Sequence, residues 1–386
     1  MELFIILTIG IYSYLFIWTT YLFFFSLAGL FYKQDNSSQN VSENRYAILI
    51  PAYKEDEVIL SSVLENLNVD FPKERFSLFV LADSLHEKTL LALRKMQVTV
   101  VPISFEKSTK AKAINKALNT LDLEGFTHVL ILDADNVMKS NFLQTIDSYP
   151  DNVLMAAQAH RTAKNQQSTM AFLDAINEEI GNHIFRKGHR AMGLSSALIG
   201  SAMVFEIELY KRLMTPIADT AGEDKMLEFA LLDEKIKVEY LADAFVYDEK
   251  VSTKEQFSGQ RTRWIAARFY FLKHYAGPAF KKLLQGDVDY FNKWLQFLLP
   301  QKIMLIAYVM LFWVISVFVP SIFLPATLLL AMLTFAMLLA VPKKRYSLQL
   351  VKAIFSLPSV VFRMIFVMLK ARKADPSHFN VTQKVA

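Results

Sequence analysis

The chain has 386 residues, of which 53% are hydrophobic and 20% charged, and its 42 basic and 37 acidic residues give a net charge of +5. This composition excludes a disordered chain, a collagen-like repeat and a disulfide-stapled secreted domain, and the absence of cysteine excludes thiolate catalysis and cysteine-ligated metal sites. The mean hydropathy of +0.26 is high for a soluble protein, so we expect apolar residues to gather in membrane segments.

The first predicted element is a long apolar helix. Residues 3–32 contain no charged side chain, and at about 1.5 Å per residue such a helix is long enough for the roughly 30 Å hydrocarbon layer of a bilayer. A cleaved signal peptide would have a basic start and a shorter apolar core. We therefore expect a retained transmembrane anchor over residues 1–32, followed by a polar linker over residues 33–44.

Short apolar runs then alternate with helical patterns through residues 45–298. We expect strands at 46–50, 78–82, 98–103 and 128–132, and helices at 57–68, 89–96 and 111–121. This alternation predicts an α/β domain whose mainly parallel sheet is covered by helices on both faces. Ligands of such sheets bind beyond the carboxyl ends of the strands, so we expect the chemistry there.

Acidic residues follow three of these strands. Glu55 comes after the first strand, Asp83 after the second, and Asp133 and Asp135 after the fourth. Mg²⁺ and Mn²⁺ prefer oxygen ligands and often share them with substrate phosphates, so an apolar strand that ends in Asp-x-Asp favours a divalent metal site. The same spacing is common in turns and helix caps, and only its position after a buried strand favours the metal.

Basic and aromatic residues add two further patterns. Gln260, Arg263 and Trp264 are spaced i, i+3 and i+4, so they would share one face of a helix. Lys110 and Arg161 lie in short basic segments, for which a solvated surface is at least as good an interpretation as a phosphate contact. The histidines show no metal-ligand spacing, and we interpret them as structural or surface residues.

A second uncharged segment spans residues 303–342, with Pro320 and Pro325 near its middle. Two helices that turn at these prolines would form a transmembrane hairpin over residues 299–342. Basic residues flank both apolar segments, at positions 33, 45 and 343–345. The positive-inside rule then places the domain between them in the cytoplasm, at the inner or plasma membrane of the cell.

The remaining residues, 343–386, are basic. The apolar stretch 354–369 contains Pro358 and Arg363 and has basic residues on both flanks, which argues against a full crossing. We expect an in-plane or re-entrant helix on anionic membrane lipids. Because the excess positive charge belongs to this tail and not to the folded domain, we expect no nucleic-acid partner.

Five segments, taken in chain order, resemble the membrane-bound branch of glycosyltransferase family 2. They are PAYKEDEVI from residue 51, ADSLHEKT from 82, ILDADN from 131, AGEDKMLEF from 221 and QRTRW from 260. The branch includes cellulose, chitin, hyaluronan and poly-N-acetylglucosamine synthases and ceramide glucosyltransferase. The resemblance covers residues 45–275 and implies an α/β fold of the GT-A type, a nucleotide-diphospho-sugar transferase domain flanked by transmembrane helices.

The resemblance also implies an inverting transfer from a UDP-sugar, dependent on Mg²⁺ or Mn²⁺, and a role for each matching residue. Asp133 and Asp135 would hold the metal and the donor diphosphate, and Asp224 would be the general base with Glu223 beside it. By themselves these two acids could simply oppose the dipole of a helix that begins there. The remaining donor-binding residues would be Pro51, Ala52, Tyr53, Glu55, Asp83, Gln260, Arg263 and Trp264, and the acceptor would meet Gly200, Ser201 and Trp264.

We expect the acceptor to be a growing polysaccharide, and transfer of a single sugar to a lipid or lipid-linked acceptor is the alternative. A growing polysaccharide is favoured by the Gln-x-x-Arg-Trp spacing, whereas a lipid or lipid-linked acceptor is favoured by a membrane region smaller than that of polysaccharide synthases. Gly222 also departs from the threonine that usually precedes Glu-Asp in the family. For export of a polymer, a homo-oligomer or a separate export partner would complete the channel. The alternative to an enzyme is a membrane scaffold or binding module without catalytic activity.

Overall fold

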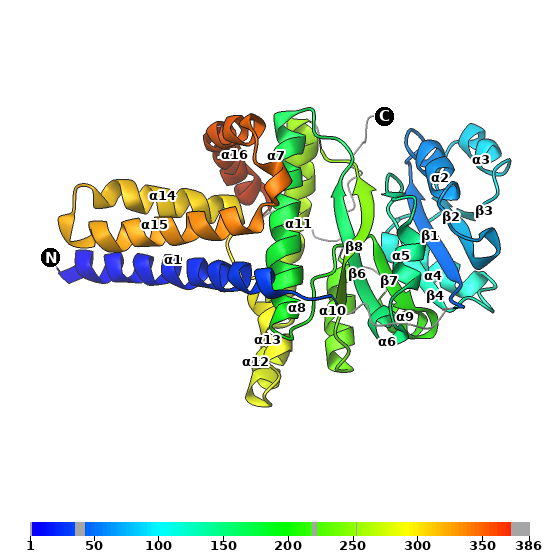
Figure 1. Ribbon diagram of the computed structural model, residues 1–386, viewed down its shortest axis with the longest axis horizontal. Helices are drawn as coiled ribbons and strands as arrows, with labels where there is room; N and C mark the ends of the chain where they lie inside the picture. Colours follow the sequence, from blue (N-terminus) through cyan, green and yellow to red (C-terminus); the bar gives the residue numbers. More distant parts are fainter. Residues whose placement is uncertain (1, 35–42, 218–221, 252, 372–386) are drawn as a thin grey trace.

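The computed structural model describes residues 2–34, 43–217, 222–251 and 253–371 (Figure 1). Most of the predicted linker and the tail beyond residue 371 lie outside these residues. Figure 1 shows a rod of three long helices joined end-on to an α/β domain. Helices α7 and α11 run across the junction between the two.

The α/β domain is built on one sheet of eight strands in the order β3-β2-β1-β4-β7-β6-β8-β5. Strands β1 to β4 are parallel, and β7 joins β4 antiparallel. All four predicted strands are present, and the α/β prediction is confirmed. The strands are β1 Tyr46–Tyr53, β2 Phe76–Asp83, β3 Thr99–Ile103, β4 His128–Ile131, β5 Val137–Met138, β6 Ala156–Ala163, β7 Met203–Glu206 and β8 Glu239–Asp248.

Helices cover both faces of this sheet, because the residues of its central strand β1 are mostly apolar and buried on both sides. In β1, Ile48 packs into one core cluster and Leu49 into the other. The first cluster includes side chains of α2 and α5, and the second includes side chains of α4, α9 and α10. The helices of the domain are α2 Ile59–Leu67, α3 Glu87–Leu93, α4 Lys110–Thr120, α5 Phe142–Asp147, α6 Asp151–Leu154, α7 Thr169–Gly181, α8 His189–Ala191, α9 Ile207–Met214, α10 Glu223–Asp233, α11 Lys254–His274, α12 Ala276–Leu284 and α13 Val288–Leu295, with short 3₁₀ turns at Gly29–Phe31, Lys73–Arg75 and Lys343–Arg345.

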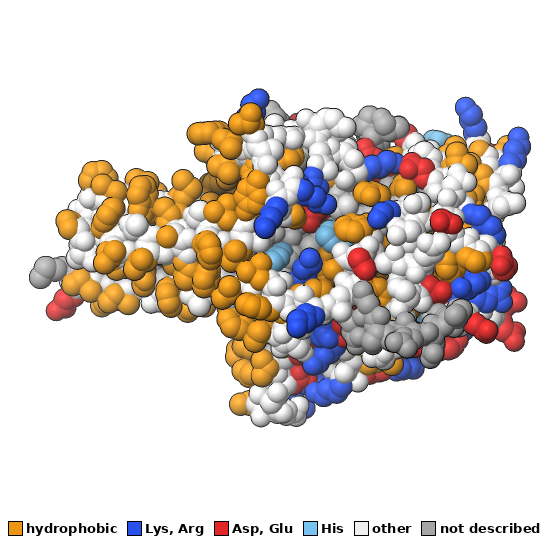
Figure 2. Space-filling model, viewed as in Figure 1, with side chains coloured by type: hydrophobic (Ala, Val, Ile, Leu, Met, Phe, Trp, Pro, Cys, Tyr) orange, Lys and Arg blue, Asp and Glu red, His pale blue; other side chains and the backbone are white. Residues whose placement is uncertain are grey.

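The rod consists of α1 (Glu2–Ala28), α14 (Lys302–Ser316) and α15 (Pro320–Ala340), which lie side by side in Figure 1. Their inner faces form one apolar cluster, whereas their outer faces leave large apolar side chains exposed, the orange surface of Figure 2. Such a surface is far larger than a soluble monomer leaves in water. Residues 5–31 and 320–340 are each long and apolar enough to cross a membrane, and α14 is shorter.

The hairpin turn differs in one detail from the prediction. The chain turns at residues 317–319, so that Pro320 is the first residue of α15, while Pro325 lies inside this helix. A proline fits the first turn of a helix because its missing N–H needs no partner there. Proline is also tolerated inside membrane helices, where neighbouring helices compensate for the lost hydrogen bond.

Helix α16 (Leu348–Ala371) is also long and apolar enough to cross a membrane. In Figure 1 it is seen nearly along its own axis, so it runs across the rod and not along it. It packs on α7 and α11 through an apolar cluster that includes Ile265, Met304 and Met364. This is the orientation expected of the in-plane helix, which stays a prediction.

The rod meets the domain at a seven-residue π-helix, η3 (Asn182–Gly188), that continues α7. The ring of His189, just beyond it, stacks on Phe25 of α1 at 4.0 Å between ring centroids. Gly188 lies so close to α1 that a Cβ there would be 2.2 Å from the backbone oxygen of Phe25. Glycine is therefore required where the two helices touch.

Replacing Gly188 by alanine should destabilise the protein by about 1–3 kcal/mol, the usual cost of forcing an added methyl group into a filled contact. Gly10→Ala in α1 is the matched control, since a Cβ there meets no atom within 4 Å. Thermal unfolding of both variants in detergent micelles measures the effect. Equal melting temperatures for the two variants would contradict the close contact.

Candidate active site

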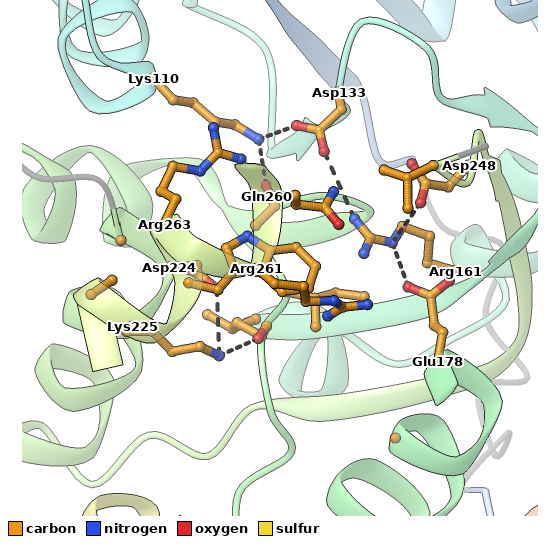
Figure 3. Close-up of a pocket in the computed structure, with 18 of the residues that line it drawn as sticks. Lys110, Asp133, Arg161, Glu178, Asp224, Lys225, Asp248, Gln260, Arg261 and Arg263 are labelled. Carbon is orange, nitrogen blue, oxygen red and sulfur yellow. Dashed lines mark hydrogen bonds and ion pairs between the residues drawn. The ribbon is translucent and has the colours of Figure 1, made fainter. Parts of the chain in front are cut away.

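A cavity of about 990 Å³ lies beyond the carboxyl ends of β1, β2 and β4 and extends to the first residues of α14 (Figure 3). Its lining includes Asp83, Asp133, Asp224 and Arg263, which come from β2, the turn after β4, α10 and α11. All predicted site residues line the cavity except Asp135 and Ser201. The others are Pro51, Ala52, Tyr53, Glu55, Gly200, Glu223, Gln260 and Trp264.

The backbone directly after β1 and β2 adopts an unusual left-handed conformation. Lys54 and Ser84, the residues directly after these strands, both have a φ of 56°, in the left-handed region that side chains other than glycine rarely adopt. The Lys54 N–H donates to the Asp83 carbonyl at 3.0 Å. Ser84 Oγ donates to the Asp83 carboxylate at 2.9 Å. Such strain is often found at functional sites, and here it fixes the neighbouring Asp83 at the cavity wall.

The Asp133 carboxylate is paired with two cations. The Lys110 ammonium, at the start of α4, contacts it directly and also donates to the Gly200 carbonyl at 2.6 Å. Arg161 of β6 lies 3.8 Å from its other oxygen. The interpretation of Lys110 and Arg161 as solvated surface residues is wrong, since their side chains are only 13% and 11% exposed. A basic side chain can be buried where a carboxylate from another part of the chain pairs with it. The local sequence around the basic residue does not reveal such a partner.

Asp135 does not line the cavity, although it was expected to hold the metal together with Asp133. Its residue is 3% exposed, and the Asn136 side-chain amide donates to its Oδ1 at 3.3 Å. The chain turns tightly after β4, with the Asn136 N–H donating to the Asp133 carbonyl, so that Asp133 alone presents its carboxylate to the cavity. Ser201 is likewise buried, and its hydroxyl donates to Asn136 Oδ1 at 2.7 Å.

A divalent cation at Asp133 would have one carboxylate ligand at the cavity wall. In the described ranges no group of three or more His, Asp or Glu residues is placed to hold a metal ion. Mg²⁺ usually takes one or two carboxylates and completes its shell with water and substrate phosphates, so Asp133 fits a metal that arrives with a donor. Such a cation would compete with Lys110 for Asp133.

Behind Arg161 lies a buried network that the sequence did not indicate. Arg161 Nε is 2.8 Å from Glu178 of α7 and 3.6 Å from Asp248, the last residue of β8, and Lys250 contacts both acids (Figure 3). Burial alone would lower the pKa of Arg161, but Asp248 and Glu178 outweigh it and raise that pKa above its usual range. The strand-end rule could have found Asp248, whereas nothing in the sequence marks Glu178.

Glu223 and Asp224 form the first turn of α10, at the cavity. Lys225 Nζ lies 3.4 Å from Asp224 and 3.2 Å from Glu228. Burial raises the pKa of Glu223 to about 7, with nearby Lys110 opposing and Asp224 adding to the shift. Phe271 of α11 packs closely against Gly222, since a Cβ at residue 222 would lie 2.6 Å from that ring, so a threonine would not fit here without a shift.

Helix α11 closes the cavity with its predicted polar face. Figure 3 shows Arg263 directed toward Lys110 and Asp133, and Gln260 directed into the cavity. The Gln260 Oε1 atom is buried without a hydrogen-bond partner among the described residues. Arg261 lies 4.4 Å above the ring of Trp264, which is 43% exposed. The face thus offers one guanidinium, one amide and one indole.

Burial lowers the pKa of Arg263, and the negative charges of Glu223 and Asp133 act in the opposite direction. A buried guanidinium between two acids remains a cation and can meet a further anion. The arrangement of Lys110, Arg263 and Asp133 therefore suits a diphosphate, either directly or through a divalent cation.

Known proteins match the chain over this domain. The model of a family described as glycosyltransferase like family 2 matches residues 44–267. A curated N-acetylglucosaminyltransferase of Rhizobium leguminosarum bv. viciae is 22% identical over 237 residues, which cover 58% of this chain and 55% of that protein. The chain thus spans about half the length of this curated relative.

Solved structures share the fold. The mannosyltransferase PcManGT of Pyrobaculum calidifontis, in complex with GDP-Man and Mn²⁺, superposes with a TM-score of 0.57 at 15% identity, over 95% of this chain and 97% of that chain. Residues 1–349 of TarS from S. aureus, in complex with UDP-GlcNAc, give a TM-score of 0.40 at 16% identity over 77% and 90% of the two chains. The first likeness shows the fold alone, and the second supports no inference.

The raised pKa of Glu223 makes a prediction for stability. The Glu223 carboxyl ionises less readily in the folded protein than in the unfolded chain. The free energy of unfolding of the protein therefore falls as pH rises from 4.5 to about 7. Glu223→Gln removes this loss, so the variant should be more stable than wild type at pH 8, by up to about 3 kcal/mol, and gain little at pH 4.5. Chemical unfolding of both proteins at the two pH values measures the difference. A gain of equal size at both would contradict the shift.

Proposed function

The chain belongs to glycosyltransferase-like family 2, and from that premise we propose that it is an inverting, metal-dependent transferase that moves a hexosyl or N-acetylhexosaminyl group from a UDP-sugar to an acceptor at the cytoplasmic membrane face. The observation that carries the proposal is the meeting of Asp83, Asp133, Asp224 and Arg263, from four separate elements, on one cavity. The match of the chain to an N-acetylglucosaminyltransferase supports an aminosugar donor.

The donor would lie with its nucleotide against the end of β1 and β2. Glu55 and Asp83 would accept hydrogen bonds from uracil and ribose, and residues 51–53 would line the base. The diphosphate would reach Lys110 and Arg263, whose positive charges balance the charge that grows on the leaving group. Mg²⁺ or Mn²⁺ held by Asp133, with Asp135 behind it, would supply further charge compensation when bound.

Transfer would then occur in one displacement at the sugar C1 carbon. The acceptor hydroxyl oxygen forms the new bond to C1 while the bond from C1 to the phosphate oxygen breaks, and the hydroxyl proton passes to Asp224. A hydroxyl is a weak nucleophile until a base takes its proton, which explains why a carboxylate is needed here. The exposed ring of Trp264 and the turn at Gly200, with the buried Ser201 behind it, would position the acceptor.

The position of the membrane helices supports a site at which the acceptor comes from the membrane side. Apolar side chains cover the rod, α12 and α16, and the charged surface begins beside them (Figure 2). The cavity extends to Lys302 at the start of α14, so an acceptor would enter from the membrane side. A growing polysaccharide and a lipid-linked sugar both fit this position.

Asp224→Asn should keep donor binding but lower the transfer rate by about 10²–10⁴-fold, because general base catalysis contributes about that factor. The measurement uses the full chain in phosphatidylcholine nanodiscs, a panel of UDP- and GDP-sugars and release of nucleoside diphosphate. Glu208→Gln, an exposed acid on α9, is the control variant. Full activity in Asp224→Asn would remove the residue from the role of base, and no release from any donor would favour the scaffold without activity.

Asp133→Asn should weaken donor binding in the presence of Mn²⁺ far more than in its absence, because the amide is a poor ligand for a hard cation. Isothermal titration with UDP, with and without Mn²⁺, separates the two cases. Equal weakening under both conditions would contradict a metal at Asp133. The same titration of the Asp135→Asn variant tests whether the buried Asp135 also contributes to metal-dependent binding of UDP.

A further inference from the structure

Four cations line the part of the cavity nearest the rod. They come from four elements and form what we call the basic chamber: Arg186 of η3, Arg268 of α11, Lys293 of α13 and Lys302 of α14. Arg186 and Lys293 are nearly fully buried, at 4% and 1% exposure. Burying a cation costs several kcal/mol unless a negative charge compensates it.

The partners of these cations are mostly neutral. Arg186 donates to the carbonyl of Ala197 at 3.1 Å, Lys293 to that of Ser196 at 3.0 Å, Lys302 to that of Asn177 at 3.2 Å and Arg268 to that of Phe297 at 2.6 Å. Within the described part of the chain, the one carboxylate within 4 Å of any of the four is Glu228, 3.9 Å from Lys293. Lys110, Arg161 and Lys250, by contrast, each contact an acid.

Two of these cations, Arg186 and Lys302, lie beside the same residue of α7. Arg186 Nη1 and Lys302 Nζ flank the same glycine, at 3.5 Å and 3.9 Å from the position of a Cβ on Gly181. Burial lowers the pKa of Lys293; the negative charges of Glu228 and Asp289 oppose this shift, and the positive charges of Lys225 and Arg186 add to it. Like charges gathered in a dry cavity favour binding of an anion, which removes their mutual repulsion.

The local backbone supports a binding role. Arg186 lies in the π-helix η3, where its guanidinium also donates to Asn182 Oδ1 at 2.8 Å. π-helical turns cost stability and are frequent at functional sites. A guanidinium and two ammonium groups together suit the oxygens of a phosphate, which accept several charge-assisted hydrogen bonds at once.

The position of the chamber indicates which molecule carries the phosphate. A chain of contacts, Asp224 to Lys225 to Glu228 to Lys293, joins it to the proposed base on the side away from Asp133. Residues 299–301, which also line the cavity, lead directly into α14 of the rod. The chamber thus lies at the end of the cavity that adjoins α14 of the rod.

We propose that the basic chamber binds the phosphate of a membrane-anchored acceptor, a lipid phosphate that carries the sugar hydroxyl to Asp224. The inference rests on the proposed function only for the role of the lipid as acceptor. The lipid chain would lie among the rod helices, the phosphate between Arg186, Lys293 and Lys302, and the sugar toward Trp264. Anchoring through phosphate also permits a saccharide of any length beyond it.

The test measures binding without any donor. The full chain in phosphatidylcholine nanodiscs is titrated with a fluorescent long-chain isoprenyl phosphate, and inorganic phosphate and pyrophosphate compete in separate arms. Wild type should bind the lipid. Lys302→Met and Arg186→Gln should each lower the affinity about tenfold or more, the loss expected for a hydrogen bond to a charged group, while UDP binding with Mn²⁺ stays unchanged.

Lys107→Met is the matched control, since it removes one exposed cation outside the cavity. Lys302→Arg should restore lipid binding, which separates a loss of charge from a loss of fold. Equal loss in Lys107→Met, displacement by free phosphate at the same concentration as the lipid, or preference for an acidic polysaccharide over isoprenyl phosphate would each overturn the proposal. Because UDP binding is measured separately, failure of lipid binding leaves the transferase assignment standing.

Discussion

Compensation of buried charge is the constraint on which the site depends. The cavity is lined by equal numbers of acidic and basic side chains, taken from both halves of the sheet and from six α-helices and the π-helix. Where these groups are buried, each of them needs a partner or a ligand. Asp133 meets Lys110 and Arg161, and Arg161 meets Glu178, so that the strand ends and α7 are held in one arrangement.

Much of the fold follows from sequence because it depends on local patterns. Short apolar runs in the sequence correctly predicted the first four strands. An acid near the end of a parallel strand must lie at the carboxyl edge of the sheet, as Asp83 and Asp133 do. The i, i+3, i+4 spacing correctly placed Gln260 and Arg263 on one cavity-facing side of α11. These properties need no knowledge of the distant chain.

The errors concern properties that depend on tertiary contacts. Lys110 and Arg161 resemble surface residues in sequence, and only the carboxylates brought to them by folding make their burial favourable. The turn after β4 directs Asp135 away from the cavity, although its spacing from Asp133 suggested a shared role. The π-helix and Glu178 have no signal in the sequence, since one extra residue per turn and one mid-helix acid both look ordinary.

Residues 169–191 form one continuous helical stretch. Glu178, near its middle, lines the cavity, and Gly188, near its end, contacts α1. Its contact with the anchor leaves no room for a methyl group, so the two helices cannot slide past each other without a backbone shift. A change in bilayer thickness that tilts α1 would therefore shift η3 and α7 through the contact at Gly188. The shift would reach Glu178, whose carboxylate contacts Arg161. Through this one contact, the position of α1 and the geometry of the candidate site depend on each other.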